Sequence, residues 1–155
     1  MKSNVYLIAG ALIAVLIIAL VILVAVPVPS ANPSADPSVN FQQAGALYTK
    51  SVDLANDGKY TEALKAADDA LALNSSQLIP IIQSNRAGIL VMLGRNADAI
   101  TAADAALSSH ENLTTTFSIA YFNKGNALKN LNRTEEAKAA YNKAHELDPT
   151  LVSPI

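Results

Sequence analysis

The sequence predicts an all-α protein with one membrane-spanning helix followed by three helical hairpins. Two observations lead to this fold class: residues 5–26 form an uncharged apolar run, and the polar remainder repeats a helix–turn–helix pattern three times. A third observation, a cluster of prolines within residues 27–39, separates the two regions. We therefore expect a short N-terminal end (1–4), a membrane helix (5–26), a linker (27–39) and a repeat domain (40–151).

The apolar run reads VYLIAGALIAVLIIALVILVAV and contains no charged residue. A helix rises about 1.5 Å per residue, so a run of this length crosses a hydrocarbon core of about 30 Å. A cleavable secretory signal is the alternative, although the apolar region of such a signal is usually only about 7–15 residues long. We expect an uncleaved signal anchor at residues 5–26, with cleavage and secretion as the alternative.

The charges around the apolar run predict its orientation. Lys2 and the terminal amine precede the run, and no further Lys or Arg occurs before Lys50. Positive charges favour the cytoplasmic side of a membrane. The N-terminus is therefore expected in the cytoplasm, and the repeat domain is expected outside it, anchored to the cell membrane by a single pass.

Four prolines interrupt residues 27–39. Proline fixes its own φ angle and lacks the N–H that a helix interior uses, so this stretch is expected to be an extended spacer and not a helix. Such a spacer would hold the repeat domain away from the lipid headgroups.

Composition limits the chemistry that the chain can perform. The formal net charge is −2, which argues against nucleic acid as a partner, and the absence of cysteine excludes disulfides and thiol nucleophiles. His110 and His145 lie about one repeat apart with no carboxylate pattern linking them, and no glycine-rich phosphate loop occurs. We expect no catalytic residue, no metal and no cofactor, and therefore no enzymatic activity.

Three alanine-rich segments recur at nearly constant spacing. Ala63, Ala99 and Ala137 mark equivalent positions that are 36 and 38 residues apart. A turn signal precedes each segment (NDGKY, LGRN and LNRT), and another segment of helical pattern precedes each turn. The repeating unit is therefore predicted to be a helical hairpin. The three predicted repeats cover about residues 44–77, 80–113 and 118–151.

The third unit, SIAYFNKGNALKNLNRTEEAKAAYNKAHELDPT, closely resembles a tetratricopeptide repeat, a helical hairpin of about 34 residues. The matching residues are Tyr121, Gly125, Leu128, Ala137, Tyr141, Ala144 and Pro149. In such a repeat Gly125 and Ala137 would let the two helices approach closely, and Tyr141 would fill a wider gap. The first two units match less completely, because alanine replaces the second aromatic residue in both. The resemblance implies three repeats in a short right-handed superhelix.

Some positions depart from the family pattern. Lys50, Arg86 and Lys124 stand where the family usually has leucine, so we expect their aliphatic stems to pack while the charged heads reach water. Lys138 and His145 occupy positions that contact the following repeat in the family. Polar residues there suit a repeat that has no neighbour, so the array is expected to end at the third unit.

The resemblance also implies that the first helix of each hairpin lines a groove that binds a protein or peptide. The groove positions carried over are Tyr48, Val52, Ile81, Ser84, Asn85, Val91, Ile119, Phe122, Asn123, Asn126 and Lys129. These residues predict a mostly apolar surface with amides that pair with a peptide backbone, unless the side chains merely pack between helices. Some members of the family bind a carboxylate chain end with clustered Lys, Arg and Asn; the cluster is incomplete here.

The sequence therefore predicts a membrane-anchored adaptor or assembly scaffold. The alternatives are a self-associating structural membrane protein and a secreted repeat protein. Candidate glycosylation sites are the three Asn-x-Ser/Thr asparagines, all in predicted loops or turns: Asn74, Asn112 and Asn132.

Overall fold

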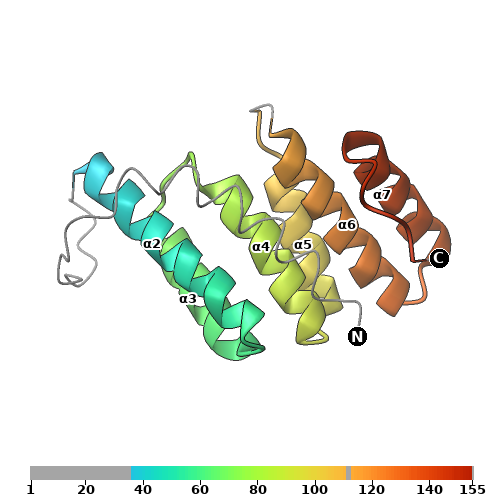
Figure 1. The fold of residues 1–155 in the computed structure, drawn as a ribbon, viewed down its shortest axis with the longest axis horizontal. Coiled ribbons are helices and arrows are strands. Elements are labelled where there is room, and N and C mark those ends of the chain that lie inside the picture. The colour runs from blue at the N-terminus through green and yellow to red at the C-terminus, as the bar shows by residue number, and fades with distance from the viewer. Residues whose placement is uncertain (1–35, 111–112, 155) are drawn as a thin grey trace. The chain divides into compact units, whose positions relative to one another are not determined.

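The computed structural model describes residues 36–110 and 113–154, which form six α-helices and no strand (Figure 1). This part of the chain confirms the prediction of an all-α fold built from helical hairpins; the superhelical arrangement stays a prediction. The expected N-terminal end (1–4), the membrane helix (5–26) and most of the linker lie outside the described residues. Among the helices of the described part, none is long and apolar enough to cross a membrane.

The described residues divide into two compact units at Ile79 and Pro80. The first unit contains α2 (Pro37–Asn56) and α3 (Tyr60–Ala72), which pack against each other. The second unit contains α4 (Ile79–Met92), α5 (Asn96–Leu107), α6 (Thr114–Asn130) and α7 (Thr134–Leu147). Within the second unit, α6 packs against both α5 and α7.

Helix α2 begins at Pro37, three residues before the predicted start of the repeat domain at residue 40. Asp36 caps this end, because its Oδ1 accepts hydrogen bonds from the backbone N–H and the hydroxyl of Ser38, at 2.9 and 2.8 Å. These hydrogen bonds lower the pKa of Asp36. The expectation that the whole proline stretch is non-helical was therefore wrong for residues 37–39. A proline is compatible with the first turn of a helix, where its missing N–H has no helical partner.

The same turn ends the first helix of every hairpin. Gly58, Gly94 and Asn132 adopt positive φ angles of 77°, 73° and 59°. In each turn, the next residue donates its backbone N–H to a carbonyl five residues earlier, as Lys59 does to Leu54 at 2.8 Å. The other two bonds are Arg95 N–H to Leu90 O and Arg133 N–H to Leu128 O, both at 2.9 Å. Each helix thus ends in a Schellman motif, in which Asn132 takes the position of glycine.

Small residues set the distance between the helices of each hairpin. Ala63, Ala99 and Ala137, the repeat markers in the sequence, are all fully buried. At Gly125 on α6, an added Cβ would lie 2.6 Å from Cε1 of Tyr141 on α7, closer than real Cβ atoms approach. The glycine therefore makes room for the tyrosine ring, which is itself buried. The sequence predicts a close approach of helices at Gly125 and a gap filled by Tyr141. In the structure these two residues contact each other.

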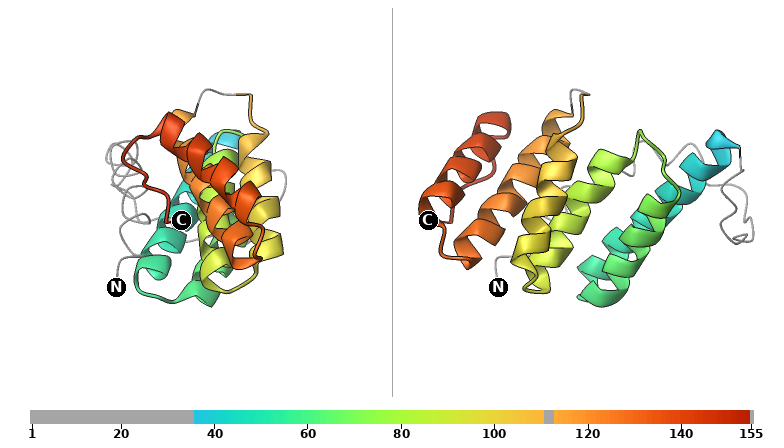
Figure 2. Two further views of the ribbon diagram at one scale, coloured as in Figure 1. Left: turned by 90° about the vertical axis from the view of Figure 1, so that its right-hand side faces the viewer. Right: turned by 180° about the vertical axis from the view of Figure 1, so that it is seen from behind.

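The C-terminal tail turns back beside α7 (Figure 2). Leu151 is buried, and its carbonyl oxygen lies 3.1 Å from Nδ1 of His145. The side chains of Lys138 and His145 are exposed, and the end of the array at the third unit stays a prediction. The sequence did not predict that the tail would place an apolar side chain in the core.

Candidate functional site

The predicted binding residues all lie on the first helices of the hairpins. Tyr48 and Val52 are on α2 in the first unit, and the other nine are on α4 and α6 in the second unit. Direct contacts hold α4 and α6 together. The hydroxyl of Ser84 donates to the carbonyl of Thr116 at 3.2 Å, and the amide of Asn123 donates to the carbonyl of Ser84 at 3.1 Å.

Four of the predicted residues are buried. Tyr48, Val52, Ser84 and Phe122 expose only 4, 5, 3 and 6 % of their surface. Burial raises the pKa of Tyr48 to about 12. The Phe122 ring lies 5.5 Å from the ring of Tyr141, in the tilted arrangement that aromatic pairs favour. These four side chains contribute to the packed interior, and their contact with a partner stays a prediction.

The remaining predicted residues form what we call the α4–α6 surface. Its members are Ile81, Asn85, Val91, Ile119, Asn123 and Asn126, all half-buried, and Lys129, which is exposed. Their helical spacing places them along one face of α4 and one face of α6. Gly88 lies between them on α4, and a Cβ there would be 3.1 Å from Nδ2 of Asn123. The absence of a side chain at Gly88 lets the Asn123 amide lie against α4.

Two asparagines of the α4–α6 surface are held by internal hydrogen bonds. Asn123 donates through Nδ2 to Ser84, and Asn126 accepts through Oδ1 from the hydroxyl of Tyr141 at 2.8 Å. Burial raises the pKa of Tyr141 from 10.0 to about 12, so this hydroxyl keeps its proton well into the alkaline range. The sequence identified both asparagines, but it did not identify Tyr141 as the residue that holds one of them. No sequence pattern links the two residues, because they lie on different helices.

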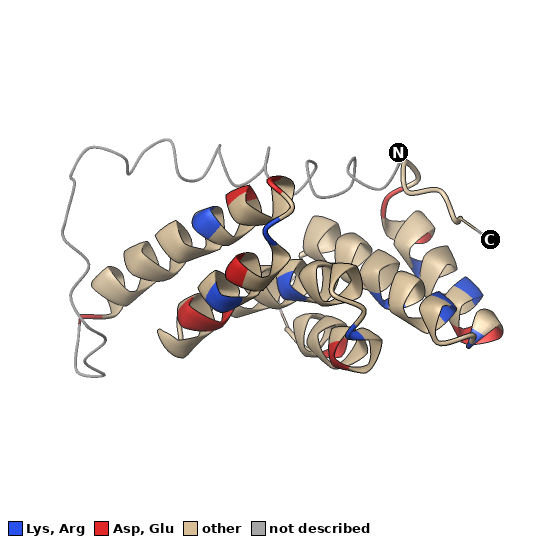
Figure 3. Ribbon diagram, turned by 90° about the horizontal axis from the view of Figure 1, so that it is seen from below, with Lys and Arg blue, Asp and Glu red and all other residues tan. Residues whose placement is uncertain are grey.

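Charge is distributed unequally over the second unit (Figure 3). Helices α4 and α6 contain no Asp or Glu, and their basic residues are Arg86, Lys124 and Lys129. The acidic residues of its helices lie on α5 and α7: Asp98, Asp104, Glu135, Glu136 and Glu146. The α4–α6 surface is therefore apolar and amide-rich, with no carboxylate of its own.

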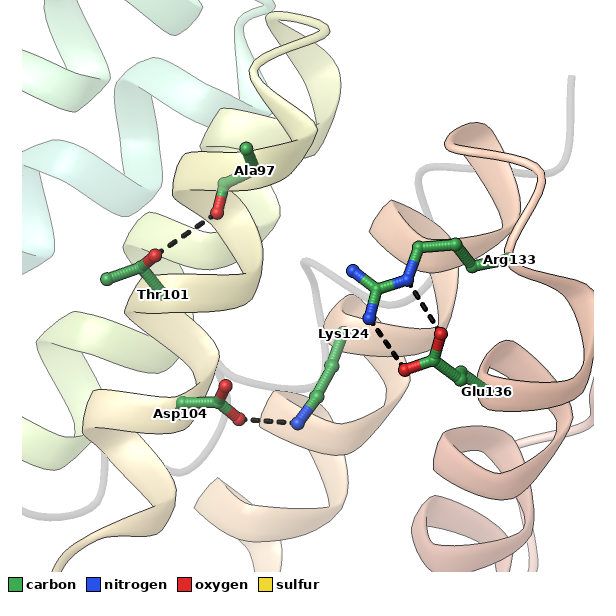
Figure 4. A network of polar contacts seen from close by, with 6 residues as sticks. All are labelled: Ala97, Thr101, Asp104, Lys124, Arg133 and Glu136. Carbon is green, nitrogen blue, oxygen red and sulfur yellow. Dashed lines mark hydrogen bonds and ion pairs between the residues drawn. The ribbon is translucent and has the colours of Figure 1, made fainter.

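Ion pairs engage most of the charges on the second unit. Lys124 on α6 binds Asp104 on α5 at 2.6 Å, and its side chain is 27 % exposed, which confirms the predicted packed stem and outward head. Figure 4 shows this pair beside the two-pronged contact between Arg133 and Glu136. That contact lowers the pKa of Glu136 and raises the pKa of Arg133. Arg95 pairs with Asp98 at the same place on α5, so the two turns are built alike.

Other predicted positions lie in turns or at the surface. Asn74 and Asn132 are exposed and have positive φ angles, and Asn112 lies outside the described residues. Glycosylation of these asparagines stays a prediction. Within residues 36–110 and 113–154, no group of His, Asp and Glu is arranged to hold a metal ion.

Family models match most of the described residues. A tetratricopeptide-repeat model matches residues 48–113, and a second one matches residues 118–151. The chain belongs to the tetratricopeptide-repeat (TPR) family. The three repeats predicted from the sequence are therefore TPR hairpins.

The chain is also similar to one curated protein and to two solved TPR domains. Protein STIP1 homolog of Dictyostelium discoideum is 33% identical over 113 residues, which is 73% of this chain. This chain spans only 19% of that relative. The first TPR domain of human RPAP3 superposes with a TM-score of 0.61 at 27% identity, covering 74% of this chain and 82% of that chain. The first TPR of Spaghetti (RPAP3) was solved bound to the HSP90 peptide SRMEEVD. It superposes with a TM-score of 0.60 at 29% identity, covering 70% of this chain and 81% of that chain.

Proposed function

We propose that this TPR protein is a non-enzymatic interaction module that binds a peptide segment of a partner protein on its first helices. The observation that carries the proposal is the α4–α6 surface. Half-buried apolar side chains lie there beside amides on a face that has no carboxylate, in a family whose solved members include a peptide complex. A surface of this kind suits an extended peptide, which supplies apolar side chains and backbone hydrogen bonds.

The proposed peptide carries little charge. The peptide bound by the Spaghetti (RPAP3) domain has three acidic side chains, in SRMEEVD. On helices α4 and α6 of this chain, Lys124 is engaged by Asp104 and Arg86 is not free. Lys129 alone is an exposed cation on these two helices. One lysine neutralises an acidic segment poorly, so an uncharged segment fits this surface better.

The proposed setting is a membrane surface. Residues 5–26 would anchor the chain and the TPR domain would face away from the cytoplasm, because the only positive charges near the run precede it. Tethering raises the effective concentration of the binding surface for partners held in the same layer, which suits an adaptor or assembly scaffold. The test of orientation is protease added outside intact cells: cleavage of the TPR domain supports the proposal, and protection contradicts it.

The binding function can be tested by selection from a phage-displayed library of random 12-residue peptides on the full chain in detergent. The proposal predicts that peptides are enriched, that they carry a net charge near zero, and that their affinity changes less than about threefold between 50 and 300 mM salt. Enrichment of acidic, salt-sensitive peptides would contradict the proposed chemistry. Failure to enrich any peptide would contradict the binding function itself. Light scattering on the same sample distinguishes a self-associating structural protein from an adaptor.

A further inference from the structure

We propose that residues 27–35 of a second copy occupy the α4–α6 surface when two copies share a membrane, until a partner peptide displaces them. This inference rests on the proposed peptide-binding function and names a competing ligand that the chain itself supplies. It gives the proline-containing segment a role beyond that of a spacer, because one copy would hold the binding surface of another copy closed.

Charge favours this segment as the occupant. Residues 27–35 read PVPSANPSA and contain no charged side chain. Helices α4 and α6 carry no carboxylate, and Lys129 is the exposed cation on them. A neutral segment loses no ionic hydration when it binds such a surface, whereas a segment with unpaired charges does.

The length and stiffness of the segment suit the two helices. Its three prolines favour an extended polyproline II conformation, which rises about 3.1 Å per residue, so nine residues reach about 28 Å. At about 1.5 Å per residue, α4 with 14 residues is about 21 Å long and α6 with 17 residues is about 26 Å long. The segment can therefore follow either helix along its whole length. Because proline restricts the unbound segment, its ordering costs less free energy on binding.

The segment offers small apolar groups to the isoleucines of the α4–α6 surface. Ile81 on α4 and Ile119 on α6 are half-buried and retain accessible apolar surface. The side chain of Val28 and the proline rings can cover this surface. Groups of this size bury little apolar area, so the contact is expected to be weak in dilute solution. A weak contact suits a ligand that a partner must displace.

A second uncharged stretch of the chain is already engaged. Residues 149–154 contain no charged side chain, but Leu151 is buried and its carbonyl oxygen lies 3.1 Å from Nδ1 of His145. The docked tail is therefore not available as an occupant. Residues 27–35 are the better candidate, because they directly follow the proposed anchor and every copy would hold them in the same layer.

A shared bilayer would raise the occupancy of this weak contact. The proposed anchor ends at residue 26, so the segment stays within about 28 Å of the membrane surface in every copy. Copies confined to this layer meet at an effective concentration far above their concentration in solution. The contact is heterologous, since the segment of one copy meets the helices of another. We therefore expect pairing in vesicles and a monomer in dilute detergent.

The test is disulfide formation between two single-cysteine variants of the full chain, which has no cysteine of its own. Val28→Cys and Ile119→Cys, with tags of different length, are reconstituted together in phosphatidylcholine vesicles and oxidised with copper phenanthroline. Val28→Cys with Ala139→Cys is the matched pair, because Ala139 is exposed on α7. We expect at least fivefold more disulfide-linked heterodimer with Ile119→Cys than with Ala139→Cys, and circular dichroism checks that all variants fold.

Competition and dilution complete the test. A saturating amount of an enriched 12-residue peptide is expected to lower the yield of the Val28–Ile119 disulfide at least fivefold, and so is transfer to detergent at about 0.1 μM protein. Equal yields for the two cysteine pairs, while the peptide still binds, overturn the inference and leave the proposed function standing. A yield that persists in dilute detergent also overturns it, because the copies are then joined by a stable contact. Equal yields together with failure to enrich any peptide contradict the inference and the proposed function together.

Discussion

The second unit presents two helix layers of opposite chemistry. The second helices, α5 and α7, carry all the helical acidic residues and pair many of their charges at the surface, as in Arg133–Glu136 and Lys143–Glu146. The first helices, α4 and α6, have no acidic residue and expose apolar and amide side chains instead. The repeat pattern requires small and apolar residues at the helix contacts of both layers, but it does not require that acidic residues be absent from α4 and α6. On this difference we base the proposal that the first helices bind the partner and the second helices face solvent.

The largest expected effect comes from breaking the contact between the layers at Gly125. Gly125→Ala would place a Cβ 2.6 Å from the Tyr141 ring, and we expect the free energy of unfolding to fall by about 2–3 kcal/mol. Gly45→Ala is the control, because the nearest atom to its added Cβ is Leu78 Cδ1 at 3.9 Å. That substitution is expected to stabilise by about 0.5–1 kcal/mol through helix propensity. Denaturation of both variants with guanidinium measures the difference; equal effects would contradict the close approach of α6 and α7.

Unfolding at alkaline pH tests whether the Tyr141 hydroxyl, which joins α7 to α6, is held inside the fold. The pKa of Tyr141 is raised from 10.0 to about 12, so the folded protein holds the phenolic proton more tightly than the unfolded chain. The contribution of the protonated Tyr141 hydroxyl to the free energy of unfolding is fully present below about pH 10 and is lost as pH rises through 12. Between pH 9 and 11 this tyrosine should account for about 1.4 kcal/mol of the lost free energy of unfolding.

Tyr141→Phe provides the comparison for that pH profile. This substitution removes the titrating hydroxyl. Between pH 9 and 11 the free energy of unfolding of the variant should therefore fall by about 1.4 kcal/mol less than that of the unaltered chain. Parallel profiles for the two proteins would show that the Tyr141 hydroxyl is not held inside the fold.

The ion pair between α5 and α6 is expected to matter less. Asp104→Asn removes the partner of Lys124 at a partly exposed site, which should cost about 0.5 kcal/mol at low salt. The cost should shrink in 0.5 M salt, because screening weakens the pair. A cost above about 2 kcal/mol, independent of salt, would indicate that Lys124 is buried more deeply than its 27 % exposure implies.

The smallest effect is expected at the turn between α6 and α7. Asn132 has a φ angle of 59°, and Gly94 takes the equivalent position between α4 and α5 with a φ angle of 73°. Asn132→Gly should therefore be neutral or stabilise the protein by up to about 0.5 kcal/mol. Asn132→Val should destabilise it, because a β-branched residue strains this conformation. Thermal melting of the pair checks the assignment, and the opposite order would contradict it.

Most of the fold could be predicted from the sequence because its determinants are periodic. The buried alanines and the turn residues recur at nearly constant spacing, and each has a local physical reason. The start of α2 was missed because Pro37 was grouped with the other prolines, although Asp36 and Ser38 make it a helix start. The buried tail residue Leu151 was missed because no repeat pattern extends to it.

The candidate site could be predicted only in part. The repeat spacing assigns the predicted residues to the first helices, but it does not tell which of their side chains are buried. Ser84 and Phe122 are buried, whereas Asn123 and Asn126 are half-buried. That separation depends on contacts between distant residues, such as Asn123 with Ser84 and Asn126 with Tyr141. Such contacts leave no sequence pattern.

We propose that a partner peptide binds the first-helix layer, and matched substitutions on the two layers test this proposal. Ile119→Asp on α6 and Ala139→Asp on α7 place the same charge on opposite layers of the second unit. With both variants folded by circular dichroism, the affinity for an enriched peptide is measured by fluorescence polarisation. We expect at least a tenfold loss of affinity for Ile119→Asp and less than a twofold change for Ala139→Asp. Equal effects, or a larger loss on α7, would contradict it.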